Sequence, residues 1–408
     1  MNPRNCVIGL LGLIVLVGGC PPTQTPTDIT ACDPQGCISE QKFLTNISNK
    51  LQNNVVGYVV TVGALPPIFS GQARTSEDKP SLAMLPSDLT IVASVSKPLT
   101  AIGVLQSLAS HNLTIDDKIW PYIYSDWKIE GKNKNIDTIT FRDLLTHSSG
   151  FREDCNDNET GYDKIKAQII AGVELTDKTP SYNNCNFVIF RDLLPVMEGI
   201  PNNLLADSQN ERGVADANFY ISYMNQHVFS PVGIQTRGCM LTTPPIDPTF
   251  LMLSYPFPAG STHGWNVGGD WTLTCSAGGW ALSAGDLFLV LNDLANGNVL
   301  LTKTQKTDKN TGMNPNCLGW DCSVRSDCPN PYVCKNGDHA TGNIAIWTYV
   351  GIFKCTVPVV VIVNSFLPSP YQSYDGSGAG LPNSGDIIGL VKDAYNGAAV
   401  AGAPQPCP

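Results

Sequence analysis

Residues 89–108, which read LTIVASVSKPLTAIGVLQSL, carry the strongest signal for the fold. The first five are typical of a strand, and leucine or isoleucine then recurs every three residues from position 99 to 108, which predicts a helix with one buried face. Proline fits only in the first turn of a helix, so Pro98 places the helix start close to Ser94. The stretch therefore predicts a strand that leads directly into a helix with a serine at its start.

Ser94 and Lys97 form a Ser-x-x-Lys tetrapeptide at that predicted helix start. Residues three apart on a helix share a face with Cβ atoms ~5–6 Å apart, so the lysine amine can reach the serine hydroxyl. A buried lysine loses part of its proton affinity and can then act as a base. The exposed N–H groups and the positive end of the helix dipole favour a developing oxyanion. We therefore predict Ser94 as a nucleophile and Lys97 as its base.

The tetrapeptide alone is weak evidence, because the chain holds two further copies, Ser76/Lys79 and Ser125/Lys128. In the first of these copies, Ser76 is followed by two acidic residues in a polar loop. In the second copy, no apolar helical run begins at Ser125. Only the copy at Ser94 stands between a strand pattern and an apolar helix.

The two ends of the chain predict one sheet with its covering helices. Residues 55–62 and the β-branched run 359–363 are typical of strands, and apolar residues recur at helical spacing over 43–51 and 387–395. Much of the sequence from 98 to 230 has a helical pattern, and we find no internal repeat. The pattern predicts an α/β fold in which a mostly helical segment is inserted between the two halves of a sheet.

Several motifs in a fixed order resemble those of the serine β-lactamase-like superfamily, which includes class C β-lactamases, D-alanyl-D-alanine carboxypeptidases and family VIII esterases. After Ser94-Val95-Ser96-Lys97 come LLTHSSG at 144–150, FSPVGI at 229–234, GGW at 278–280 with Asp286-Leu287, and LGW at 318–320. The similarity spans roughly residues 50–395. It implies the β-lactamase/transpeptidase-like α/β (α+β) fold, with an antiparallel sheet flanked by helices and a mostly helical subdomain. It also implies that His147 is structural and that no metal or organic cofactor is needed.

The superfamily's second motif is Tyr-x-Asn, whose tyrosine passes a proton to the leaving group while the asparagine orients the lysine and the substrate. Tyr182-Asn183-Asn184 precedes an apolar helical run and resembles this motif in its context. Tyr223-Met224-Asn225 lies inside a predicted helix, and Ser181-x-Asn183 would mimic a related Ser-x-Asn motif. We prefer Tyr182 as a catalytic residue and Asn184 as a substrate-binding residue.

The third motif, Lys-Thr-Gly or His-x-Gly, lies on an edge strand, supplies a cation and contributes the second oxyanion N–H. Lys335-Asn336-Gly337 fits with asparagine in place of threonine, whereas the alternative His339-Ala340-Thr341-Gly342 is one residue too long. We favour Lys335 and Gly337, so the N–H of Asp338 would be the second oxyanion donor. The acidic residue at that position argues against strong binding of a substrate carboxylate.

The N-terminus is typical of an exported lipoprotein. An apolar run from Val7 to Val17 ends in Val17-Gly18-Gly19-Cys20 and is too short to span a bilayer, which needs ~20 residues. The small residues before Cys20 resemble a bacterial lipobox, which would lipidate that cysteine. We therefore expect a signal peptide at 1–20, a tether at 21–38 and the hydrolase domain at 39–400. The expected location is the bacterial cell envelope, at the outer membrane or in the periplasm, with plain secretion as the alternative.

The composition of the chain argues against some classes of binding partner. Asp and Glu outnumber Lys and Arg by 35 to 25, and no basic run is present, which argues against nucleic acid. Of 14 cysteines, 12 remain after Cys6 and Cys20, an even number that predicts disulfides in an exported protein. The cysteine-rich insertion 317–334 lacks the Cys-x-x-Cys pairs of typical zinc sites, so we expect disulfides there too and no metal.

These motifs predict a serine hydrolase that forms an acyl-enzyme on Ser94 and acts on a small ester, an amide or a peptidoglycan-derived substrate. The fold alone does not determine the class of substrate. The imperfect third motif favours a carboxylesterase or a D-amino-acid peptidase over a β-lactamase. A catalytically silent surface lipoprotein that binds peptidoglycan or peptides is the alternative from another class. Oligomeric state cannot be predicted from the sequence.

Overall fold

The computed structural model describes residues 28–152, 155, 161–201, 209–239, 251–267, 269–323, 333–341, 344–371 and 386–406. The predicted signal peptide and the predicted lipidation site at Cys20 lie outside these residues. Among the helices that the structure describes, none is long and apolar enough to cross a membrane.

The central sheet is antiparallel and is built from both ends of the chain, as predicted. Its strand order is β5 (Leu82–Ala83), β4 (Ile68–Arg74), β3 (Gly57–Val62), β10 (Val357–Val363), β9 (Ile344–Phe353) and β8 (Val333–Thr341). The β-branched strand β10 pairs with β3 on one side and β9 on the other. Strand β8 is therefore left at one edge of the sheet.

Both faces of the sheet are covered. Val359, Val361 and Val363 of β10 pack with α1 (Glu40–Leu51) and α10 (Ile387–Asn396), while Val360 and Ile362 face the core that includes α8 (Ala284–Asn296). Successive side chains of a strand point to opposite faces, so a strand buried on both sides needs a continuous apolar run. This explains the run at 359–363.

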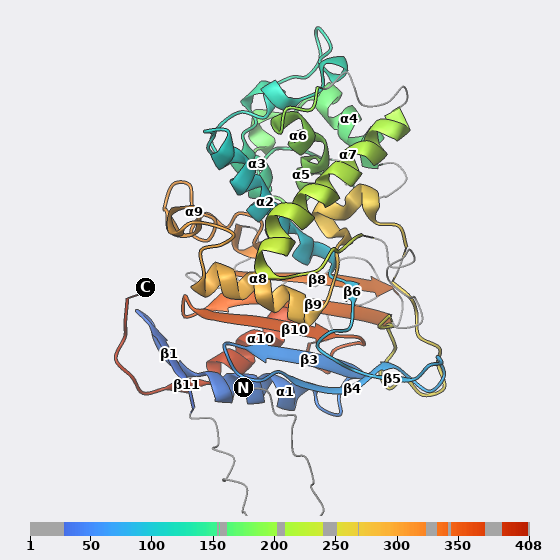
Figure 1. The fold of residues 1–408 in the computed structure, drawn as a ribbon, viewed down its shortest axis with the longest axis vertical. Coiled ribbons are helices and arrows are strands. Elements are labelled where there is room, and N and C mark those ends of the chain that lie inside the picture. Colours follow the sequence, from blue (N-terminus) through green and yellow to red (C-terminus); the bar gives the residue numbers. More distant parts are fainter. Residues whose placement is uncertain are drawn as a thin grey trace, which may run out of the picture.

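A mostly helical subdomain stands at one end of the molecule, beyond the β8 edge of the sheet (Figure 1). It contains α2 (Ser96–Ser110), α3 (Phe141–Leu145), α4 (Gly161–Ala171), α5 (Cys185–Val188), α6 (Phe190–Met197) and α7 (Gln209–Met224). The short helix α9 (Lys303–Thr307) lies further along the chain. The capping box predicted at Thr140 and Asp143 starts α3. The predicted antiparallel sheet flanked by helices, with a mostly helical subdomain, is thus confirmed.

The predicted tether is wrong at its C-terminal end. Strands β1 (Thr30–Asp33) and β2 (Gly36–Ser39) form a hairpin closed by a disulfide between Cys32 and Cys37, and β11 (Ala399–Val400) pairs with β2. A cross-linked hairpin of this size needs no apolar periodicity to hold its shape, so the sequence pattern did not reveal it. The ordered structure therefore begins by Thr30.

Every cysteine in the described part of the chain is disulfide-bonded. Bonds join Cys32 to Cys37, Cys155 to Cys185, Cys239 to Cys275 and Cys317 to Cys322. Cys334 and Cys355 are also oxidised. The disulfides expected from the even count are present, including one within the 317–334 insertion.

A buried carboxyl pair joins α6 to α7 in the helical subdomain. Asp192 and Asp216 are 2% and 0% exposed and hydrogen-bond to each other, and the Tyr124 hydroxyl donates to Asp216 Oδ2 at 2.7 Å. Arg191, also buried, pairs with Asp192. Burial, together with the charge of Asp192, raises the pKa of Asp216 to about 8. At neutral pH this carboxyl therefore holds a proton in the folded chain.

This pair predicts a pH-dependent stability. A carboxyl whose pKa is raised on folding stabilises the fold fully below its unfolded value, and that stabilisation is lost as the pH rises to its folded value. The difference in unfolding free energy between wild type and Asp216→Asn should therefore shrink by up to about 1.4 kcal/mol per pH unit above pH ~4 and level off near pH 8. Urea unfolding from pH 5 to 9 measures this difference, and a constant value across that range would refute the shared proton.

Candidate active site

Ser94 sits in a tight turn between a strand and a helix, as predicted. The strand β6 (Thr90–Ile91) pairs with β7 (Ala281–Leu282), and the 3-10 turn Ala93–Val95 then leads into α2. Ala93 has a φ of 47°, which lies in the left-handed region that non-glycine residues rarely adopt. This turn leaves Ser94 half-buried while Lys97, one helical turn on, is fully buried.

The Lys97 ammonium has three donors, and each meets an oxygen. Its Nζ lies 3.0 Å from Ser94 Oγ, 2.8 Å from Asn184 Oδ1 and 2.7 Å from the Ala277 carbonyl oxygen. Because two of these oxygens belong to other elements, the side chain is held in one orientation. The lysine is aimed at the serine hydroxyl.

Tyr182 completes the group around Ser94. Its hydroxyl is 2.5 Å from Ser94 Oγ, and Lys97 Nζ lies 4.9 Å from the centre of its ring. The ring of the buried His147 is 4.6 Å behind it. The tyrosine ring, 43% exposed, therefore lies between the buried amine and the solvent.

His147 acts on this site through the backbone. Its Nδ1 accepts a hydrogen bond from the Asn183 N–H at 3.2 Å. Burial, reinforced by the charges of Lys97 and Lys335, holds the pKa of His147 well below its usual value. A neutral imidazole suits the acceptor role, so His147 supports the Tyr182 segment, as the structural interpretation of this histidine predicts.

The edge strand β8 passes directly beside the nucleophile turn. A Cβ placed on Gly337 would lie 2.2 Å from the Val92 carbonyl oxygen and 3.0 Å from Ser94 N, so only glycine allows this approach. The Asn336 N–H donates to Asp321 Oδ2 at 3.1 Å, away from β9. Backbone N–H groups two residues apart in a strand point the same way, so the Asp338 N–H points away from β9, toward the side of β8 that Ser94 lies on.

Lys335 reaches the same site from β8 but is paired. Its Nζ donates to Asp321 Oδ1, and the two side chains are 2% and 3% exposed. The Nζ also lies 5.0 Å from the centre of the Tyr182 ring. The structure thus brings the predicted residues Ser94, Lys97, Tyr182, Asn184, Lys335, Gly337 and Asp338 together at one place.

These residues border a cleft of about 660 Å³ between the nucleophile turn, β8 and the helical subdomain. Its wall is formed by residues 93–94, 180–182, 184, 271, 274, 277–278, 321, 335–336 and 338–339. Trp271 and His339 supply aromatic surface, with ring centres 5.0 Å apart. A cleft of this size holds a small molecule or the end of a peptide.

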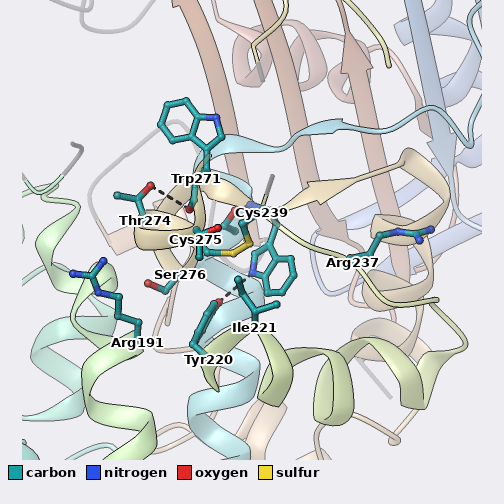
Figure 2. The surroundings of a disulfide bond; sticks show 12 residues. Arg191, Tyr220, Ile221, Arg237, Cys239, Trp271, Thr274, Cys275 and Ser276 are labelled. Atoms are coloured by element: carbon teal, nitrogen blue, oxygen red, sulfur yellow. Dashed lines mark hydrogen bonds between the residues drawn. A yellow bond between two sulfur atoms is a disulfide. The ribbon is translucent and has the colours of Figure 1, made fainter. Parts of the chain in front are cut away.

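The Cys239–Cys275 disulfide lies close to Trp271 and Thr274 (Figure 2), two residues that border the cleft. Cys275 begins the π-helical turn Cys275–Gly279, which contains the Ala277 carbonyl that receives Lys97, and Thr274 and Trp271 lie next to the bond. The backbone N–H of Trp271 donates to the Cys239 carbonyl at 2.8 Å. The cross-link thereby ties the turn that orients the lysine to a second segment of the chain.

Of the alternative motif copies, Ser181 of Ser181-x-Asn183 borders the cleft, and the others lie elsewhere or are incomplete in the described residues. Tyr223 is 6% exposed in α7, where its hydroxyl donates to the Gly103 carbonyl at 3.4 Å. Ser76 is in an exposed turn, and Ser125 begins a separate 3-10 turn. His339 lines the cleft, but Gly342 lies outside the described residues. Across the part of the chain that the structure describes, no cluster of His, Cys, Asp or Glu could hold a metal ion.

Two participants were missed by the sequence analysis. The Ala277 carbonyl is a backbone group, so the residue type at this position could not indicate that it binds Lys97. Asp321 directly follows the LGW tripeptide, and its position before Cys322 in the insertion was the only available signal.

Comparison with known proteins agrees with this geometry. The model of the family described as Beta-lactamase matches residues 76–316. A beta-lactamase/D-alanine carboxypeptidase from Pseudomonas syringae aligns with 81% of this chain and 94% of its own, at 15% identity and a TM-score of 0.57. A class C beta lactamase from Rhodobacter sphaeroides aligns with 88% of this chain and 98% of its own, at 16% identity and a TM-score of 0.57.

A D-amino acid amidase from Ochrobactrum anthropi SV3, in a complex with L-phenylalanine amide, aligns with 88% of this chain and 98% of its own, at 14% identity and a TM-score of 0.58. At these identities the likeness to the solved structures shows the fold. No match is found among curated protein sequences.

Proposed function

This chain belongs to the Beta-lactamase family, whose members are serine hydrolases, and from that premise we propose that it hydrolyses esters or D-amino-acid peptides and amides through an acyl-enzyme on Ser94. The observation that carries the proposal is the contact of one hydroxyl with both the Lys97 amine and the Tyr182 phenol. Ser94 Oγ lies 3.0 Å from Lys97 Nζ and 2.5 Å from the Tyr182 hydroxyl. Both distances are within reach of direct proton transfer.

In the proposed acylation step, the Lys97–Tyr182 pair holds one proton fewer than an ammonium and a phenol together, so it can accept a proton. Ser94 Oγ attacks the carbonyl carbon while its proton passes to that pair. The N–H groups of Ser94 and Asp338 receive the oxyanion. As the tetrahedral intermediate collapses, Tyr182 returns the proton to the departing alcohol or amine. In deacylation a water molecule attacks the ester carbonyl, the pair takes its proton, and the acid leaves as Ser94 regains its hydrogen. Each proton borrowed from oxygen is returned, so the cycle needs no cofactor.

The pairing of Lys335 supports an esterase or D-amino-acid peptidase rather than a β-lactamase. A β-lactam such as penicillin carries a carboxylate beside its reactive ring, and a cation in the third motif would be its natural partner. Here the Lys335 ammonium already donates to Asp321. The silent binding-protein alternative finds less support, because the serine, lysine and tyrosine are in mutual contact rather than displaced.

We expect a fluorophosphonate to add to the wild-type protein once per chain and not to add to Ser94→Ala. Intact mass spectrometry of the two proteins after equal incubation measures the adduct. A fluorescent penicillin, tested in the same way, should label slowly or not at all. A folded wild-type protein that takes no fluorophosphonate would favour the silent binding protein. A lasting penicillin adduct would favour peptidase-like over esterase-like recognition, and hydrolysis of penicillin without a lasting adduct would favour the β-lactamase.

A further inference from the structure

Asp321 is a buried carboxylate that is bound to the cation of the third motif. It receives Lys335 Nζ on one oxygen and the Asn336 N–H, at 3.1 Å, on the other. The side chains of Asp321 and Lys335 are 3% and 2% exposed, although both residues border the cleft. Charges held in so little water are weakly screened, so they act on neighbouring groups over several ångströms. Removal of either partner would leave the charge of the other unopposed.

Asp321 is held in place by its surroundings. The next residue, Cys322, is bonded to Cys317. Gly319, two residues before Asp321, has a φ of 80°, and a Cβ there would lie 2.9 Å from the Lys97 carbonyl oxygen. The segment is therefore pressed against the start of α2. The carboxylate is a fixed part of the site.

The Lys335 amine faces the same aromatic ring as the amine of Lys97. The two Nζ atoms lie 5.0 Å and 4.9 Å from the centre of the Tyr182 ring. The charge of Lys335 also acts at His147, whose ring centre is 4.6 Å from that of Tyr182. After burial and the charge of Lys97, it is the next cause that lowers the pKa of this imidazole. A change in the net charge of the Asp321–Lys335 pair should therefore reach the proton that Lys97 and Tyr182 share.

We propose that Asp321 sets the pH at which the Lys97–Tyr182 pair can accept the proton of Ser94, by offsetting the charge of Lys335. Asp321 is then a positioning residue, because it acts through Lys335 rather than on the reacting atoms. A cation beside a base favours the deprotonated form of that base and makes it weaker. The carboxylate thus keeps the pair basic enough to take the serine proton. The inference rests on the proposed acyl-enzyme chemistry at Ser94 and adds the regulation of that site by charge.

Other titratable groups in the described part of the chain face the same site. His147 lies beside the Tyr182 ring, and Asp338 and His339 on β8 border the cleft. Burial lowers the pKa of His339 to about 4, so this imidazole is neutral near pH 7. All three groups are present in every variant of Asp321 and Lys335. A comparison among such variants therefore isolates the charge of the Asp321–Lys335 pair.

A double-mutant cycle read by pH profile tests the proposal. The acid limb of kcat/KM for an uncharged ester, p-nitrophenyl butyrate, reports an ionisation of the free enzyme. Asp321→Asn leaves the cation unopposed and should move this limb to lower pH by at least about half a unit, since solvent at the partly exposed Tyr182 ring reduces the effect. Lys335→Gln leaves the carboxylate unopposed and should move the limb to higher pH. The double variant, neutral at both positions, should return to within about 0.2 units of the wild type.

Two features of the design separate charge from structure. Asparagine at position 321 keeps an oxygen that can accept the Asn336 N–H, so the contact with β8 can persist. The control Glu130→Gln removes one negative charge at an exposed position outside the cleft and should leave the limb unchanged. All profiles are recorded at one low ionic strength, because salt screens charges near the surface.

A purely structural role for Asp321 would lower the rate at every pH without moving the limb. Limbs that do not move, or that move the same way in both single variants, overturn the inference while wild-type turnover and fluorophosphonate labelling still support the acyl-enzyme. A wild-type protein that neither labels nor hydrolyses the ester overturns the proposed function itself. If one single variant does not fold, the other decides by comparison with the double variant, because the two expected shifts have opposite signs.

Discussion

Lys97→Met should lower the rate at which Ser94 is acylated by on the order of 10⁴-fold, which is the scale of loss when a base is removed from a nucleophile that depends on it. The lysine is fully buried and is the group whose amine lies 3.0 Å from Ser94 Oγ. Methionine keeps much of the side-chain volume but can neither accept nor return a proton. Stopped-flow measurement of ester burst kinetics, together with the time course of fluorophosphonate addition, gives the acylation rate directly.

The matched control is Lys79→Met, because Lys79 belongs to one of the two other Ser-x-x-Lys copies and is exposed. It should change neither rate. Loss of Lys97 also leaves the buried Asn184 Oδ1 and Ala277 carbonyl without this donor, at a cost of about 1–3 kcal/mol for each oxygen. Circular dichroism and urea unfolding must therefore show that Lys97→Met is folded at the assay temperature. Acylation of the folded variant within tenfold of the wild-type rate would exclude Lys97 as the base.

Local sequence signals predicted the parts of the fold and site that depend on spacing along the chain. Ser94 and Lys97 are three residues apart on one helical turn, and the β-branched run at 359–363 can only be buried on both faces of a sheet. The order of the superfamily motifs then indicated which distant segments would meet. Tyr182, Lys335 and Gly337 were chosen in this way, and the structure brings all three to the nucleophile turn.

Features that depend on a partner far away in the sequence were not predictable in the same way. Whether the Lys335 ammonium faces a substrate or a carboxylate depends on the path of the 317–334 insertion, and that path depends on which cysteines pair. The Ala277 carbonyl is placed by a π-helical turn, which has no side-chain signature. The hairpin at Thr30–Ser39 is closed by a disulfide rather than by an apolar pattern.

Gly337→Ala should lower kcat by about 10²–10³-fold while the chain stays folded, the scale of loss when one oxyanion donor is removed. The new methyl carbon would start 2.2 Å from the Val92 carbonyl oxygen and 3.1 Å from Ala93 Cβ, so either β8 or the nucleophile turn must move. Strand β8 moves more easily, because it is the edge strand and pairs only with β9 in the described sheet. Any retreat carries the Asp338 N–H away from Ser94.

Because Gly337→Ala displaces the Asp338 N–H rather than Ser94, this variant separates oxyanion binding from activation of the nucleophile. The contacts of Lys97 and Tyr182 with Ser94 do not involve β8, so the serine should remain activated and should still add fluorophosphonate, though more slowly. The control Gly389→Ala lies in α10, where the nearest atom to a new Cβ is Tyr371 Cδ1 at 3.8 Å, and it should keep the wild-type kcat. A Gly337→Ala enzyme with wild-type kcat and an intact β8–β9 pair would mean that the Asp338 N–H does not bind the oxyanion, and that its second donor must come from another element.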